Sequence, residues 1–486
     1  MNSNVAAERN VDEDLLKNTR ISDHFPSTKA PPLWFSKRFL VTLLLFVSSV
    51  NKNSLSGKIS IAIVEMTSSK EINRDNQTIT QPPEYDWDSK TIGLIVSSPS
   101  IGYLCICVGG ILSTRFGGSV TYGISMAMSG ILSLLGPASL YVHLYVFVAN
   151  RVLSGLFEGF ASASTSEIFA RWAPVQERSR LTSYGTSGTH VGIALTYPIC
   201  GYLIKKWGWT APFYVEGAVS FIWSLLWLIF IKNDPSKDKR ISKRELDYIQ
   251  QGTGNVRRRH VTSQFRNIFI SPVFWALCIG KMAYSWVFTI LLICLPFYVK
   301  DTTHRPTEEV GLLSSIPNMV SIAMIPIAGT FIDYWQNHSK LEITQIHKIL
   351  MGIGFVVGSL LLVTVALISN FTVSMVCFIL IKIVGSLNGV IVQVIVLYMA
   401  PNNSSIIAGL SAFWYRVSTV LTRTTLGYMT PNHSVQEWNQ FFILSAIILF
   451  LSAIIFTLYG SSKPQPWSSI PTSNDEDQNP SIENKD

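Results

Sequence analysis

The feature that most constrains this chain is a series of apolar stretches, each long enough to cross a lipid bilayer. A spanning helix needs about 20 predominantly apolar residues. Only 14% of the 486 residues are charged, too few to solvate a soluble protein of this size. The sequence therefore predicts an all-α, multi-pass membrane protein with twelve transmembrane helices, at residues 39–66, 91–112, 119–138, 142–170, 182–204, 211–231, 272–297, 309–333, 347–369, 371–398, 404–428 and 439–460.

The loops between these stretches predict the orientation. Lys and Arg gather before the first stretch, after the fourth, and in the loop at about 232–270, which contains "VRRRH". Cytoplasmic loops carry an excess of Lys and Arg, so both termini are expected in the cytoplasm. The first outer loop then holds "NQT" at Asn76, a predicted glycosylation site. This asymmetry accounts for the net charge of +8, and we expect no nucleic-acid partner.

The long basic loop divides the twelve stretches into two groups of six. Within it, "SKRE" at 242–245 matches a capping box that opens a short helix. The predicted organisation is a cytoplasmic N-terminal tail at 1–38, a six-helix half at 39–231, a basic cytoplasmic linker at 232–270, a second six-helix half at 271–460, and a disordered cytoplasmic tail at 461–486.

Two short patterns recur at matching places in the two groups. Ala173-Pro174 and Ala400-Pro401 follow the fourth and tenth stretches, and "GGILSTRFGG" (109–118) and "AGTFIDYW" (328–335) follow the second and eighth. Many transporters are built from such repeats, with the substrate site between the repeats near the membrane midplane. The patterns predict two pseudo-symmetric halves.

Several motifs occur in a family order: "RVLSGLFEGF", "RWAPVQERSRL", "PFYVEG" at 212–217, and "LPFYVKD" with "GLLSSIPNMVS". On these motifs the chain resembles, over nearly its full length, the anion-transporting branch of the major facilitator superfamily. That branch contains sialin, the vesicular glutamate transporters and the sodium–phosphate cotransporters. The resemblance implies the major facilitator fold with alternating access, an organic or inorganic anion as substrate, and coupling to protons, sodium or the membrane potential.

Some positions depart from the pattern of that family. Ser56 stands where an arginine usually ends the first span, and Ser166 where sialin-like members have a histidine. Ile395 and Tyr398 replace an Asn and an Asp near "YMAP". The substrate, the coupling ion and whether these changes abolish transport therefore stay open.

Charged residues inside the predicted spans mark a candidate site, because such residues cost at least ~2.5 kcal/mol and are usually functional or paired. Arg151 and Glu158 are two helical turns apart, on nearly one face. Arg151 is predicted to bind the anion with its two-pronged guanidinium, the alternative being a structural ion pair. Glu158 is either a coupling group that carries a proton or a fixed partner of a cation.

Further cations surround this pair in the predicted spans. Lys52 and Lys281 are candidate substrate contacts, and Tyr284 either shapes the pocket or simply packs. Lys58, nearer the outer end of its span, is expected to extend its ammonium to the membrane surface. The surplus of cations over carboxylates favours an anionic substrate.

The loop after the fourth span is predicted to act as a cytoplasmic latch. Glu177 and Arg178 lie in it, and Asp333 lies in the matching turn of the second half, so the three could hold span ends together in one state. The alternative is that the basic residues only fix topology. Glu167 and Arg171, one turn apart, are expected to pair at the membrane edge.

The leading interpretation is a monomeric secondary transporter of a small anion, in contact with membrane lipid. It would lie in the plasma membrane or in a lysosomal or vesicular membrane. A transport-inactive receptor or scaffold with a transporter fold is the second hypothesis. No nucleophile elbow, metal-ligand spacing or phosphate loop is seen, so we expect no enzyme activity, cofactor or bound metal, apart from a proton or sodium ion as coupling ion.

Overall fold

The computed structural model describes residues 31–67, 70–74, 77–253, 265–303, 307–368, 370–431 and 434–468. Ten helical segments in these residues are long and apolar enough to cross a membrane. The long helices α7 (Arg178–Trp207) and α16 (Ser404–Met429) complete a set of twelve. The predicted twelve-helix, multi-pass membrane fold is confirmed.

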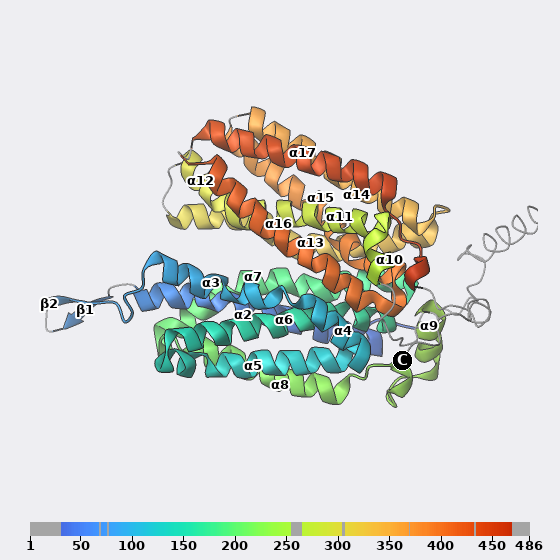
Figure 1. Cartoon of the computed structure of the whole chain (residues 1–486), viewed down its shortest axis with the longest axis horizontal. Coiled ribbons are helices and arrows are strands. Elements are labelled where there is room, and N and C mark those ends of the chain that lie inside the picture. The colour runs from blue at the N-terminus through green and yellow to red at the C-terminus, as the bar shows by residue number, and fades with distance from the viewer. Residues whose placement is uncertain are drawn as a thin grey trace, which may run out of the picture.

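The first half contains six spans. They are α2 (Lys37–Thr67), α3 (Ser89–Tyr103) continued by α4 (Ile106–Phe116), α5 (Gly118–Val142), α6 (Leu144–Trp172), α7 and α8 (Ala211–Phe230). Between α2 and α3, the strands β1 (Lys70–Arg74) and β2 (Gln77–Gln81) pair antiparallel with Ile72 opposite Ile79. This hairpin lies at one end of the helices in Figure 1, which we call the outer end.

The second half follows the basic linker, which contains η3 (Pro235–Lys237), α9 (Lys243–Thr253) and α10 (Phe265–Ile270). Its first span is α11 (Pro272–Thr289), a π-helical turn (Ile290–Cys294) and α12 (Leu295–Thr303). The other five are α13 (Thr307–His338), α14 (Ile343–Leu367), α15 (Phe371–Met399), α16 and α17 (Val435–Tyr459). Helix α9 lies at the end of the helices opposite the hairpin (Figure 1), and its basic linker marks that end as cytoplasmic.

The packing partners repeat between the halves. In the first half α2 packs on α7, α5 on α8 and on α6, and α3 on α6. The corresponding pairs of the second half are α11 with α16, α14 with α17 and with α15, and α13 with α15. The contacts between the halves repeat as well, because α13 packs on α7 and α16 packs on α4. The two halves are therefore pseudo-symmetric, and each buries its own apolar core.

The halves meet at their cytoplasmic ends. Within the described residues, the hydrogen bonds between the halves join the start of α7 to α13 and α15, and the start of α16 to α4 and α6. Figure 1 shows the first half (blue to green) diverging from the second (yellow to red) toward the outer end. The structure is therefore closed toward the cytoplasm.

Two glycines permit this close approach, and both lie in the patterns that recur between the halves. A Cβ on Gly110 of α4 would lie 2.5 Å from the carbonyl oxygen of Ser405 on α16. A Cβ on Gly329 of α13 would lie 2.6 Å from the carbonyl oxygen of Ser179 on α7 and would clash with the Ser183 hydroxyl. The repeated glycines mark the two symmetry-related contacts between the halves.

The disordered tail was predicted at 461–486, but its first residues, 461–468, are packed against the protein. Residues 461–468 pack against the cytoplasmic ends of α14 and α15: Gln465 donates its backbone N–H to Met399, Ser462 hydrogen-bonds His347, and Trp467 is buried. These residues hydrogen-bond the Met399 carbonyl and the His347 imidazole. The polar composition of the tail does not predict such contacts. Asn76, most of the N-terminal tail and residues 469–486 lie outside the described residues.

Candidate functional site

Four charged side chains gather inside the first half, and we call them the N-half charge cluster: Lys58, Arg151, Glu158 and Glu216. Lys58 is 1% exposed; its Nζ lies 3.6 Å from Glu216 Oε2 and donates to Ser133 Oγ. Lys58, Arg151 and Glu158 line one cavity between α2, α5 and α6. Ser54 and the Cys200 thiol also hydrogen-bond Glu216, at 2.5 and 3.2 Å.

The expectation that Lys58 reaches the membrane surface is wrong. Helix α2 continues to Thr67, so Lys58 lies more than two turns from its end and points between α5 and α8. Its ammonium also lies 4.9 Å from the ring centroid of Phe213. Glu216 was visible in the "PFYVEG" motif, but its partner is far away in the sequence, so the motif did not reveal the pair.

Arg151 and Glu158 lie together, as their spacing on α6 requires. Arg151 is 4% exposed, and its Nε has no hydrogen-bond partner among the described residues. Glu158 is its electrostatic partner and also interacts with Arg416 of α16. A buried donor without a partner is costly, so Arg151 has capacity to bind an anion.

A second cavity lies between the two halves, and we call it the central cavity. Thr186, Thr189 and His190 line it from α7, and Lys281, Tyr284, Gln393 and Tyr415 line it from the second half. Lys281 Nζ donates to Ser411 Oγ at 2.7 Å. Gly389 makes room for Tyr284, because a Cβ there would lie 2.6 Å from the tyrosine oxygen. Two of the predicted substrate contacts, Lys281 and Tyr284, therefore share this cavity.

Two further cations lie on helix surfaces that face a neighbouring helix. Lys52 of α2 contacts α6, and Arg416 of α16 contacts α3. Lys52 is half-buried and donates to Ser162 Oγ at 2.9 Å. The Arg416 guanidinium lies 4.0 Å from the ring centroid of Tyr103, across the boundary between the halves. The predicted site residues thus occupy three positions: Arg151 with Glu158, Lys281 with Tyr284, and Lys52 with Ser162. The sequence did not single out His190, which only the packing of the halves brings to the boundary.

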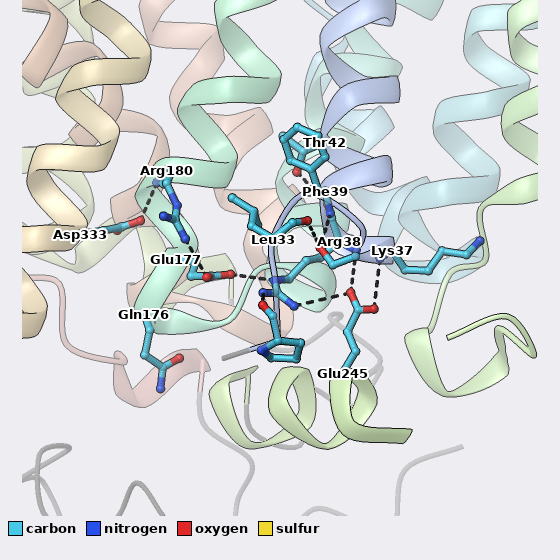
Figure 2. A network of polar contacts seen from close by, with 12 residues as sticks. Leu33, Lys37, Arg38, Phe39, Thr42, Gln176, Glu177, Arg180, Glu245 and Asp333 are labelled. Atoms are coloured by element: carbon cyan, nitrogen blue, oxygen red, sulfur yellow. Dashed lines mark hydrogen bonds and ion pairs between the residues drawn. The ribbon is translucent and has the colours of Figure 1, made fainter. Parts of the chain in front are cut away.

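At the cytoplasmic end, Arg38 is fully buried in a network of charges (Figure 2). Its Nε donates to Glu177 Oε2 at 2.7 Å, and Glu177 Oε1 accepts from Arg180 at the same distance. Glu245 of α9 lies 3.6 Å from the Arg38 guanidinium and accepts the backbone N–H groups of Lys37 and Arg38. The linker carboxylate therefore caps the start of α2.

The aromatic face of α9 completes this network. The Arg38 guanidinium lies 5.0 Å from the ring centroid of Tyr248. Burial raises the pKa of the Tyr248 phenol to about 12, and the neighbouring Glu177 carboxylate acts in the same direction. The phenol is therefore neutral at physiological pH, and the ring offers its π-face to the cation.

The three predicted latch residues make different contacts. Asp333 of α13 accepts the backbone N–H groups of Ser179 and Arg180, at 3.0 and 2.7 Å, and so caps α7 from the opposite half. Arg178 donates to the carbonyl of Leu397 across the same boundary and lies over the ring of Tyr398, at 4.8 Å. Glu177 instead pairs within the first half.

The symmetry-related contact has no carboxylate in the place of Asp333. Thr114 lies four residues after Gly110, as Asp333 lies four after Gly329, and its hydroxyl is 2.9 Å from the Ser405 hydroxyl. Glu167 supplies a carboxylate from α6 instead: it accepts from Ser113 and from Ser405. The expected Glu167–Arg171 pair is present at 3.2 Å. Glu167 therefore has two roles: it pairs with Arg171 in its own helix, and it contacts Ser405 of the other half.

A family model described as Major Facilitator Superfamily matches residues 40–422. The structure of the proton:xylose symporter XylE bound to 6-bromo-6-deoxy-D-glucose matches with a TM-score of 0.65 and 16% identity. The match covers 89% of this chain and 98% of that one, and at this identity it concerns the fold.

Curated proteins give closer sequence similarity. Vesicular glutamate transporter 2 of Mus musculus is 27% identical over 442 residues, which cover 89% of this chain and 75% of that protein. Vesicular glutamate transporter 3 of Danio rerio is 27% identical over 464 residues, which cover 92% and 78%. The similarity therefore extends over both halves and the linker.

Proposed function

The chain belongs to the major facilitator superfamily, and from this membership we propose that it is a secondary active transporter that moves a small anion by alternating access. The central cavity carries the proposal, because residues of both halves line it and contacts between the halves close the cytoplasmic side. Rocking of the halves about this cavity would expose it to each side in turn. The membrane is that of the cell surface or of a lysosome or vesicle.

The charges around the central cavity support an anionic substrate. Lys281 lines the cavity, and Lys52 and Arg416 lie on the facing helix surfaces nearby. Their contacts in the described residues are with hydroxyl groups and an aromatic ring, apart from the electrostatic interaction of Arg416 with Glu158. We assign Arg151, Lys52, Lys281 and Tyr284 to substrate binding.

Glu158 is proposed as the coupling group. It interacts with Arg151 of its own helix and with Arg416 of the opposite half, so its charge acts on the boundary between the halves. Binding a proton or a sodium ion would weaken its attraction to both arginines.

Uptake by purified protein in proteoliposomes tests the function. Labelled glutamate, phosphate, sialic acid and urate would each be offered with an inward pH gradient, a sodium gradient, or a potassium diffusion potential. We expect saturable, gradient-dependent uptake of at least one anion. Arg151→Ala should abolish it, whereas Arg115→Ala, at an exposed arginine of α4, should leave it unchanged.

Two results would contradict these assignments in different ways. Binding without flux under every gradient would favour the receptor or scaffold hypothesis over transport. Unchanged uptake by the Arg151→Ala variant would refute the role of Arg151 while leaving transport established. Arg151→Lys, which keeps the charge but not the fork geometry, should retain part of the uptake.

A further inference from the structure

A third cavity lies within the second half, and we call it the C-half cavity. Helices α11, α13, α14, α15 and α17 line it, and His190 of the first half lines it as well. It shares His190, Tyr284, Phe288 and Ile325 with the central cavity, so the two cavities adjoin. None of the predicted substrate contacts except Tyr284 lines it.

Lys382 is the charged residue of the C-half cavity. It is 7% exposed, and its ammonium lies 4.7 Å from the ring centroid of Phe288. Among the described residues, this ammonium has no hydrogen-bond partner and no carboxylate within ion-pair distance. Lys52, Lys58 and Lys281 each hydrogen-bond a serine hydroxyl. Lys382 differs from these three lysines because its ammonium has no hydroxyl partner in the described residues. It can therefore bind an anionic ligand.

Asn388 places a second unpaired polar group in the same cavity. Its side chain is 2% exposed, and Oδ1 has no hydrogen-bond partner among the described residues. The amide lies against Gly354, where a Cβ would clash with it. A buried carbonyl oxygen without a donor is costly. A ligand with a hydroxyl or N–H group would satisfy it.

The remaining walls are largely apolar. Phe288, Phe355, Ile381 and Leu449 contribute side chains from four helices. Inorganic phosphate would lose its hydration there, and a single ammonium would be its compensating charge. The apolar part of an organic anion, in contrast, is stabilised by transfer from water to these walls. The walls therefore select an organic anion.

We propose that the C-half cavity is a second anion subsite, in which Lys382 binds the carboxylate of an organic anion with an apolar body and Asn388 accepts a hydrogen bond from its hydroxyl or N–H group. This inference rests on the proposed anion transport, because the ligand reaches the subsite from the central cavity. His190 closes the subsite from the first half, and its ring lies 6.0 Å from that of Phe288. A ligand in the subsite therefore contacts both halves.

Equilibrium binding to the purified full-length protein tests the subsite. The ligands are 4-hydroxybenzoate, benzoate, which lacks the hydroxyl, and inorganic phosphate. Wild-type protein should bind 4-hydroxybenzoate more tightly than benzoate, and phosphate should not compete. Lys382→Met should weaken the binding of both carboxylates, raising each Kd by about tenfold or more. Asn388→Leu should remove the difference between the two carboxylates.

The controls separate charge from packing. Lys382→Arg should bind both carboxylates nearly as the wild type does, and Lys300→Met, at an exposed lysine of α12, should change nothing. If Lys382→Met fails to fold, the Arg variant and Asn388→Leu still test the subsite.

The outcomes also distinguish the subsite from transport. Absence of 4-hydroxybenzoate binding, competition by phosphate, or unchanged affinity in Lys382→Met would each overturn the subsite, even if the wild type takes up another anion in proteoliposomes. Binding with the expected mutant pattern but without any gradient-driven uptake would uphold the subsite and refute the transport on which its route depends.

Discussion

Glu158, a carboxylate of the first half, interacts electrostatically with an arginine of each half. Arg151 lies two turns before it on α6, and Arg416 belongs to α16 of the second half. A proton on Glu158 would therefore change the attraction across the boundary as well as the charge near Arg151. A single side chain can in this way link ion binding to the arrangement of the halves.

Glu158→Gln should separate coupling from substrate movement. We expect gradient-driven uptake to fall by about tenfold or more, because the amide cannot gain or lose the coupling ion. Counterflow exchange of the same anion, which needs no coupling, should continue. The measurement is uptake by proteoliposomes under a gradient and under preloaded exchange. Loss of both activities would assign Glu158 to substrate binding or to folding instead.

The pair formed by Lys58 and Glu216 predicts an effect on stability. Glu216→Gln removes the carboxylate that lies 3.6 Å from the Lys58 ammonium, and losing one member of a buried ion pair costs about 3 kcal/mol. The thermal unfolding midpoint in detergent should fall clearly. Lys58→Met added to Glu216→Gln should restore much of the midpoint, because neither charge of this pair then remains. Lys205→Met, at an exposed lysine, is the control, and an unchanged midpoint in Glu216→Gln would refute the pair.

The contrast between local and distant pairs explains what the sequence could predict at this scale. Glu167 and Arg171 are one turn apart, so helical spacing alone predicted their contact. The rotation and depth of each helix decide which side chains meet between spans, and no local pattern reports them. Lys58 with Glu216 and Arg416 with Tyr103 are of this kind.

At the scale of elements, helix α9 uses its capping motif in an unexpected way. Ser242 caps the helix as "SKRE" predicts, since its hydroxyl accepts the Glu245 backbone N–H at 3.2 Å. The Glu245 carboxylate, however, accepts from the start of α2 rather than from its own helix. The linker thereby becomes part of the first half. Helix existence was predictable from the motif, but its docking position was not.

Glu245→Gln should loosen the docking of α9. The variant loses the charge on the α2 cap and the attraction to Arg38, worth about 1 kcal/mol. Hydrogen exchange of the amides in Lys243–Thr253 should therefore quicken about fivefold. Asp247→Asn, at an exposed carboxylate of the same helix, should have no effect. Equal exchange in both variants would show that Glu245 does not hold the linker.

At the scale of the whole molecule, the two contacts between halves share a geometry but differ in chemistry. Gly110 and Gly329 allow the same close approach of two helices. At one contact Asp333 caps α7, and at the other the Thr114 hydroxyl meets the Ser405 hydroxyl at the start of α16. The recurring patterns predicted two similar halves. They did not predict that the halves meet at these glycines, because that depends on how the finished bundles pack.

Gly329→Ala should open the cytoplasmic side. The added Cβ collides with the backbone of α7, so the closed state loses stability and the open state gains population. Ser404 is buried at the opposite contact, and Ser404→Cys reports on it. In a background otherwise free of cysteine, its labelling by an impermeant maleimide from the cytoplasmic side should quicken about fivefold or more.

Gly201→Ala is the matched control, because no atom lies within 4 Å of a Cβ at that position of α7. Its labelling rate should equal that of the parent protein. Equal rates in Gly329→Ala as well would mean that the helices adjust locally and that the glycine does not govern closure.

The cap of α2 by Glu245 also sets an order of events during protein synthesis. The backbone groups of Lys37 and Arg38 emerge first, while their carboxylate partner lies 208 and 207 residues further along the chain. The ribosome must therefore finish all six spans of the first half before the first span is capped. Glu245 nevertheless precedes α11, so the cap is available before any span of the second half exists. The nascent second half then assembles against a first half whose first span is already capped.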